Sequence, residues 1–213
     1  MRMKMLASLF AAGALLGTGQ AQAAACAVDL TIGTWTSCTD ADGDVTYTRG
    51  TTTIDSSYLV SIGETVSGLN SVTVTAPSPT PGIAGEFVPG TYDLNYTATK
   101  AVGSDERFIS AKIDSTVGSV ATTPATVTVN KVVSNVNPGV NLTSNDGSPD
   151  GFVFYDPTMF LNVTDNVTVG TGGSLSNFTN TYGDVHVPEP GSMLLLGIGL
   201  MGLAYNGKKK LFV

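Results

Sequence analysis

The stretch 125-ATVTVNKVV-133 alternates apolar and polar residues with a period of two. This period places one set of side chains on a core and the other in water, as in a half-buried β-strand. Val, Thr and Tyr suit such a pleated, half-buried surface. Similar alternation, strict or looser, recurs along the chain at 44–54, 71–76, 91–100, 107–113, 151–156 and 159–164.

Turn sequences separate these runs, among them "DADGD" at 40–44 and "NDGSPDG" at 145–151. Eight or more short strands with such turns predict an all-β fold, an antiparallel β-sandwich that is immunoglobulin-like in the loose sense. The Pro-rich stretch 76–82 either separates a small disulfide-bearing subdomain or forms a stiff loop within one fold, and we favour the single fold. We expect 174–186 to form a last strand and a flexible stalk.

The N-terminus has the organisation of a secretory signal peptide. Arg2 and Lys4 precede the apolar run 5–16, and a small-residue "AQA" site follows at 21–23. The run is shorter than the roughly 20 residues of a membrane-spanning helix. We therefore predict a signal peptide at 1–23, an extracytoplasmic body at 24–186 and a separate C-terminal region at 187–213.

The chain has two cysteines, Cys26 and Cys38. An exported even pair predicts a disulfide in an oxidising compartment. The alternative is a lipid anchor on Cys26, but "AAAC" resembles a lipoprotein box poorly because Ala23 stands where such boxes carry Leu. We favour the disulfide.

The body is strongly acidic. The chain carries a net charge of −7, and residues 24–186 hold sixteen of its acidic residues but only five of its basic ones. A nucleic-acid partner is therefore not expected, because no basic patch is present to neutralise phosphates.

The C-terminal region combines three features in order. Val187-Pro188-Glu189-Pro190 should be extended, because proline lacks a backbone N–H and disfavours helix in the residue before it. Gly191 to Tyr205 is an uncharged run that predicts a short transmembrane helix of about 22 Å, and Lys208, Lys209 and Lys210 should hold its end on the cytoplasmic side.

This order closely resembles the PEP-CTERM sorting signal of Gram-negative bacteria; we recognise no family in the body itself. The resemblance implies that an exosortase, a membrane-embedded transpeptidase-like enzyme, recognises the tripeptide and processes the tail. It also implies transient insertion in the inner membrane, followed by release to the cell surface or to an extracellular, polysaccharide-containing biofilm matrix. One departure is that "LFV" follows the lysines.

The sharpest candidate for a metal site is the alternating set Asp40, Asp42 and Asp44, which matches the first three ligand positions of an EF-hand loop. Val45 stands at the position of the sharp-turn glycine, and Thr51 at that of the closing glutamate. We expect a polar hairpin turn here and no cofactor, with a weak Ca²⁺ site as the alternative.

Catalytic groups are scarce. The single histidine, His186, adjoins the sorting signal, where we do not expect it to face a structured pocket, and Trp35 is expected in the core. We therefore expect a non-enzymatic surface or matrix protein with a structural or adhesive role. The alternatives are a secreted carbohydrate-active enzyme with a carboxylate pair and a protein held permanently by its C-terminal anchor.

Overall fold

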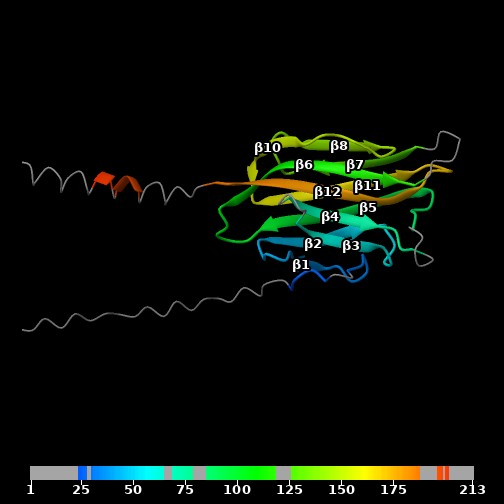
Figure 1. The fold of residues 1–213 in the computed structure, drawn as a ribbon, viewed down its shortest axis with the longest axis horizontal. Helices are drawn as coiled ribbons and strands as arrows, with labels where there is room; N and C mark the ends of the chain where they lie inside the picture. Colours follow the sequence, from blue (N-terminus) through cyan, green and yellow to red (C-terminus); the bar gives the residue numbers. More distant parts are fainter. Residues whose placement is uncertain are drawn as a thin grey trace, which may run out of the picture.

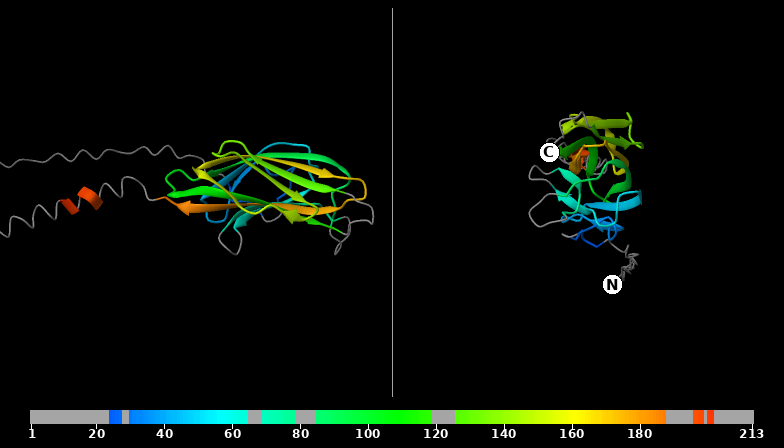
Figure 2. Two further views of the ribbon diagram at one scale, coloured as in Figure 1. Left: turned by 90° about the horizontal axis from the view of Figure 1, so that it is seen from above. Right: turned by 90° about the vertical axis from the view of Figure 1, so that its right-hand side faces the viewer.

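The computed structural model describes residues 24–27, 30–64, 69–78, 85–118, 126–187, 196–198 and 200–201. The described residues up to 187 form a body that is nearly all β, with strands that run along its long axis (Figures 1 and 2). The strands are β1 (Ser37–Thr39), β2 (Val45–Thr52), β3 (Leu59–Glu64), β4 (Asn70–Thr75), β5 (Gly90–Lys100), β6 (Glu106–Val117), β7 (Val127–Val133), β8 (Val140–Asn145), β9 (Ser148–Pro149), β10 (Val153–Thr158), β11 (Phe160–Val169) and β12 (Leu175–His186).

The strands form two antiparallel sheets. A seven-stranded sheet has the order β1-β2-β5-β11-β7-β8-β9, and a five-stranded sheet has the order β10-β6-β12-β4-β3. The early strands β1 to β3 lie at one edge of the body, and β8 and β10 lie at the other (Figure 1). Strands from before and after the Pro-rich stretch 76–82 occur in both sheets.

The all-β prediction is confirmed, and every alternating run of the sequence contains a strand. The stalk predicted within 174–186 is wrong, because β12 continues to His186 and pairs with β6 and β4 on its two sides. Its inward positions Phe178, Asn180 and Tyr182 are fully buried, which explains why this segment is a central strand.

The core lies between the two sheets and is built from the inward positions of the strands. In β11, for example, Leu161, Val163, Val167 and Val169 are buried while their neighbours are more exposed. Truncation of such a side chain to alanine costs about 2–5 kcal/mol, because the lost contacts leave a cavity.

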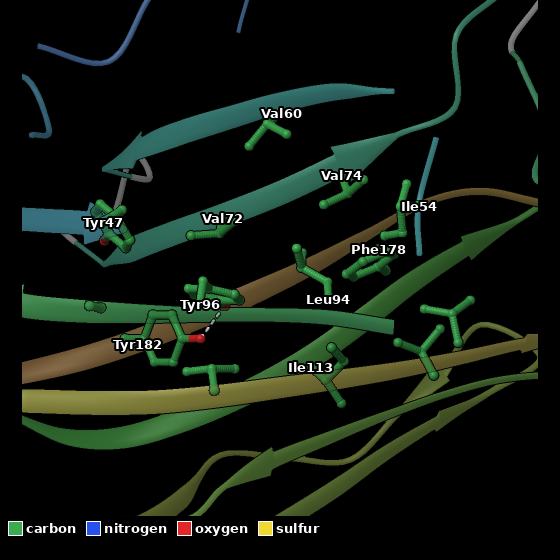
Figure 3. Packing of buried hydrophobic residues seen from close by; sticks show 14 of the residues in the cluster. Tyr47, Ile54, Val60, Val72, Val74, Leu94, Tyr96, Ile113, Phe178 and Tyr182 are labelled. Atoms are coloured by element: carbon green, nitrogen blue, oxygen red, sulfur yellow. Dashed lines mark hydrogen bonds between the residues drawn. The ribbon is translucent and has the colours of Figure 1, made fainter. Parts of the chain in front are cut away.

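Aromatic residues join the sheets at the middle of this core. The hydroxyls of Tyr96 on β5 and Tyr182 on β12 form a hydrogen bond across the interface (Figure 3). The ring of Trp35, which is fully buried as predicted, lies 5.7 Å from that of Tyr96. The buried hydroxyls thus find partners within the core, as buried polar groups must.

The two ends of the chain are described only in part. The predicted signal peptide at 1–23 lies outside the described residues, as do Pro188 to Pro190 and Lys208 to Lys210. Of the predicted helix Gly191–Tyr205, residues 196–198 and 200–201 are described and helical. The described residues include no helix with the length and apolar character needed to cross a membrane.

Candidate functional site

A pocket of about 640 Å³ opens at one end of the body. It is formed by the β1–β2 connection, the end of β3, the start of β4, the β5–β6 connection with the start of β6, and the end of β12. Seven of its eleven lining residues are Asp or Glu, so the pocket attracts cations and repels anions. The acidic lining residues are Asp40, Asp42, Asp44, Glu64, Asp105, Glu106 and Asp184.

The "DADGD" segment is the hairpin turn that the sequence predicts, between the antiparallel strands β1 and β2. Oδ1 of Asp40 accepts hydrogen bonds from the backbone N–H groups of Gly43, Asp44 and Val45 at 3.0, 3.1 and 3.2 Å. Gly43 has φ 79°, in the left-handed region that favours glycine. The Asp40 carboxylate therefore stabilises the turn, because it accepts hydrogen bonds from three of the turn's backbone N–H groups.

Lys100, at the end of β5, pairs with three of the acidic residues that line this pocket. Its side chain is shielded from solvent, and its ammonium donates to Asp44 at 2.8 Å, to Glu106 at 2.6 Å and to Asp184. Burial alone would lower the pKa of Lys100, but hydrogen bonds to these three carboxylates raise it above its ordinary value. The lysine therefore stays charged and neutralises part of the acidic cluster.

Asp40 and Asp44 respond to this environment in opposite directions. Burial raises the pKa of Asp40 to about 7, and its hydrogen bond with Asp44 adds to the rise. Burial also acts to raise the pKa of Asp44, but hydrogen bonds from Asp40 and Lys100 outweigh it and lower the value to about 2. One proton is thus held between two neighbouring carboxyl groups at moderately acid pH.

The structure does not bring the predicted metal ligands Asp40, Asp42 and Asp44 together as a set. Asp44 instead groups with Glu106 and Asp184: one carboxylate oxygen from each of the three lies within 4.8 Å of the other two. These three carboxylates surround the ammonium of Lys100, which lies where a cation would be held. This grouping could not be read from the sequence, because it joins a turn and two strands that are distant along the chain.

His186 lies at the rim of the same pocket, and the expectation that it would face no structured pocket is wrong. Its Nδ1 is 3.4 Å from Asp105, and its Nε2 is 3.4 Å from Glu106. The expectation failed because β12 remains in the sheet up to His186 and carries it beside the β5–β6 connection.

The predicted disulfide Cys26–Cys38 is present. It ties residues 24–27, which hydrogen-bond with Thr39, to β1. Because β1 leads into the Asp40–Asp44 turn, the disulfide braces the segment that presents Asp44 to Lys100.

A second group of buried polar residues was missed by the sequence reasoning. Lys131 on β7, Asp165 on β11 and Asn180 on β12 are each inaccessible to solvent. All three occupy inward positions, between buried apolar neighbours two residues away on either side. The alternating pattern could have revealed them, because a polar residue at a position where the pattern expects an apolar one indicates a polar group inside the core.

Comparison with known protein families gives one match. The model described as the PEP-CTERM protein-sorting motif matches residues 186–209, so the chain carries this motif at its C-terminal end. The match begins at His186, the residue at which β12 ends. No curated protein matches the chain. The motif indicates an exported protein that an exosortase sorts at the membrane.

Proposed function

We propose that this protein is a non-enzymatic, structural or adhesive component of a bacterial cell surface or extracellular matrix. The proposal is carried by the position of the sorting motif relative to the fold. The motif begins at His186, where β12 ends, so no strand of the described residues extends past its first residue. Cleavage of the tail would therefore leave both sheets intact, as sorting of a folded body requires.

The composition of the body supports a structural role. The body is rich in Thr, Ser and Asn and poor in basic residues, which suits a hydrated matrix and permits contact with polysaccharide. We propose that the body needs no cofactor and that exosortase is the partner of the tail.

Fractionation of cells with and without the exosortase tests the sorting step. We expect the protein to reach the surface or matrix with a shortened C-terminus only when the enzyme is present. Glu189→Gln in the motif should cause retention of the unprocessed chain, whereas the same exchange at Glu86, on the exposed body surface, should not. Unchanged location and mass in cells lacking the exosortase would contradict the proposal.

A second candidate, a carbohydrate-active enzyme, is favoured by the acidic pocket. Its Asp40 and Asp44 have pKa values of about 7 and about 2, which is the pattern of a paired acid and base. The two groups hydrogen-bond to each other, however, whereas glycosidase carboxylates stand about 5 Å or more apart. Polysaccharide cleavage by the purified chain that Asp44→Asn abolishes would favour this enzyme over the structural role.

A permanent membrane anchor is the remaining alternative for the tail. The mass of the mature C-terminus separates the two: an intact end that includes Lys208 to Lys210 supports the anchor, and a shortened end supports processing.

A further inference from the structure

The buried group formed by Lys131, Asp165 and Asn180 lies between the two sheets. Lys131 and Asp165 are register partners on the adjacent strands β7 and β11 of the seven-stranded sheet. Asn180 belongs to β12 in the five-stranded sheet. An amine, a carboxyl group and a carboxamide are thus enclosed together in the core between the sheets.

The contacts of this group join Asn180 to Asp165 and place the amine of Lys131 against β6 and β12. Nδ2 of Asn180 lies 2.6 Å from Oδ2 of Asp165. Nζ of Lys131 donates to the backbone carbonyl of Lys112 at 3.3 Å and stands 3.7 Å from the centroid of the Tyr182 ring. Lys112 precedes Ile113, the register partner of Asn180, so the amine reaches the strand position beside Asn180.

The polar groups of this cluster satisfy one another only in part. Lys131 forms no ion pair with any described residue. Among the described residues, Oδ1 of Asp165 and Oδ1 of Asn180 find no hydrogen-bond partner. Unpaired polar atoms in a core each cost about 1–3 kcal/mol, so this arrangement calls for an explanation other than stabilisation by an ion pair.

The protonation states favoured by this environment suit a reaction. Burial lowers the pKa of the Lys131 amine, an effect that the nearby Asp165 only partly opposes. Burial likewise raises the pKa of Asp165, against the opposing influence of Lys131 and Asn180. The environment therefore favours a neutral, nucleophilic amine beside a protonated carboxylic acid, the forms that amide exchange needs.

We propose that Lys131 and Asn180 form an intramolecular amide bond that joins the two sheets, with Asp165 as the catalytic acid and base. The reaction requires only the folded chain. It therefore goes beyond the proposed function and does not depend on it.

The chemistry balances without an external reagent. A half-turn of the Asn180 carboxamide exchanges its oxygen and nitrogen, so that the protonated Asp165 donates to the carbonyl oxygen. The lone pair of Lys131 Nζ attacks Cγ of Asn180, and a new C–N bond forms. Asp165 then transfers the proton from the attacking amine to the departing nitrogen, the Cγ–Nδ2 bond breaks, and one ammonia leaves. Nothing is oxidised or reduced.

The fold supplies what such a reaction lacks in water. Aminolysis of an unactivated amide is slow in solution, but fixed reactants gain effective molarities of up to about 10⁵–10⁸ M. The enclosed site excludes competing water and keeps Asp165 in position as the proton carrier.

The bond would tie β12 to the opposite sheet. Because β12 ends at the residue where the sorting motif begins, force applied to the C-terminus would pass into both sheets through a covalent link. A surface protein anchored or pulled by that end would gain mechanical strength.

Peptide mapping of the full chain tests the proposal. After reduction and unfolding, a protease that cleaves before aspartate releases peptides 114–145 and 165–183, which carry Lys131 and Asn180. We expect one joined species, lighter than the sum of the two peptides by one ammonia. Separate peptides of unmodified mass would overturn the proposal. A joined species lighter by one water would place the bond on Asp165 and overturn the assignment to Asn180.

Variants assign the roles. Asp165→Asn keeps the shape of the side chain but removes the acid, so most of the chain should yield separate peptides. Lys112→Arg, at the neighbouring partly exposed lysine, should leave the joined species unchanged. If Asp165→Asn fails to fold, the peptide map of the wild-type chain still shows whether the amide bond is present. Production of the chain in a host without exosortase should give the same map, so failure of the bond and failure of the sorting proposal are distinguishable.

Discussion

The two buried lysines of the seven-stranded sheet have opposite surroundings. Lys100 lies at the end of β5, where turns and strand ends bring three carboxylates to its ammonium. Lys131 lies within β7, enclosed by the core, with Asp165 as its register partner and a single carboxyl group nearby. Both occupy inward positions and both side chains are shielded from solvent.

The difference shows that burial alone does not decide what a lysine does. At Lys100 the neighbouring carboxylates outweigh the effect of burial and raise the pKa, so the side chain acts as a fixed counterion. At Lys131 burial outweighs a single carboxyl group and lowers the pKa, so the side chain is available as a nucleophile. One lysine therefore holds the acidic pocket together by charge, and the other is placed to hold the sheets together by a bond.

The largest effect is expected when the acceptor for Lys131 is removed. Asn180→Ala should lower the free energy of unfolding by about 4–5 kcal/mol, because a link closing a loop of this length contributes about 4 kcal/mol on the chain-entropy estimate. Denaturant unfolding measures the change. The control is Asn177→Ala on the same strand, at a partly exposed position. If Asn180→Ala and Asn177→Ala lowered the free energy of unfolding equally, Lys131 would not form the covalent link that distinguishes it from Lys100.

The next largest effect is expected at Lys100. Lys100→Ala leaves Asp44, Glu106 and Asp184 without a counterion and should cost about 3–4 kcal/mol at neutral pH. Calcium should restore much of this loss in the variant, as read from its melting temperature, and should leave the wild type unchanged.

The control for Lys100 is Lys112→Ala, which removes a partly exposed pair with Asp114 and should cost less than about 1 kcal/mol. A similar loss for both lysines, or stabilisation of the wild type by calcium, would show that Lys100 is not the resident cation of the cluster.

A smaller effect is expected from the disulfide. Its loop has a sequence separation of 12, and Cys26→Ser with Cys38→Ser should lower the free energy of unfolding by about 2–3 kcal/mol. Because the disulfide braces the strand that leads to Asp44, the loss should increase the labelling of Lys100 in the native state, as amine-reactive mass spectrometry would report. Peptides 114–145 and 165–183 should remain joined. Their separation would show that the two regions are not independent.

The smallest effect is expected at Asp40 and depends on pH. Its pKa in the folded protein, about 7, exceeds its ordinary value of 3.8. The folded state therefore binds the Asp40 proton more tightly than the unfolded state does. The stability that this proton contributes is complete below about pH 4 and is lost as the pH rises through 7. Asp40→Asn keeps an oxygen for the turn but removes this titration, so its free energy of unfolding should vary less between pH 4 and 8, by about 1 kcal/mol after solvent screening.

The control for Asp40 is Asp42→Asn in the same turn. A pH profile of Asp40→Asn that runs parallel to that of the wild type would show that the proton is not held at Asp40.

The sequence predicted what depends on local pattern. Period-two alternation located most strands, and the even cysteine pair predicted the disulfide. The strands β1, β3, β8 and β9 were not predicted. β1 and β9 have only three and two residues, β3 buries only Val60, and the polar Ser144 takes an inward position in β8. The all-β class and the sorting motif were likewise readable, the motif because its three parts are contiguous.

What the sequence did not predict depends on contacts between distant segments. Asp44, Glu106 and Asp184 meet only because the ends of both sheets converge on the pocket. The sequence could have indicated three buried polar residues one by one, because each stands at a position where the alternation expects an apolar residue: Lys131, Asp165 and Asn180. Their meeting in one cluster required the pairing of β7 with β11 and the packing of β12 across the core.

Amine labelling of the unfolded protein tests the difference between the two lysines most directly. The full chain is unfolded in guanidinium and treated with an amine-reactive reagent, and the modification of each lysine is then measured by mass spectrometry. We expect Lys100 and Lys112 to be labelled completely and Lys131 to remain unlabelled, because its nitrogen is part of an amide. Equal labelling of Lys100 and Lys131 would contradict the covalent link between the sheets.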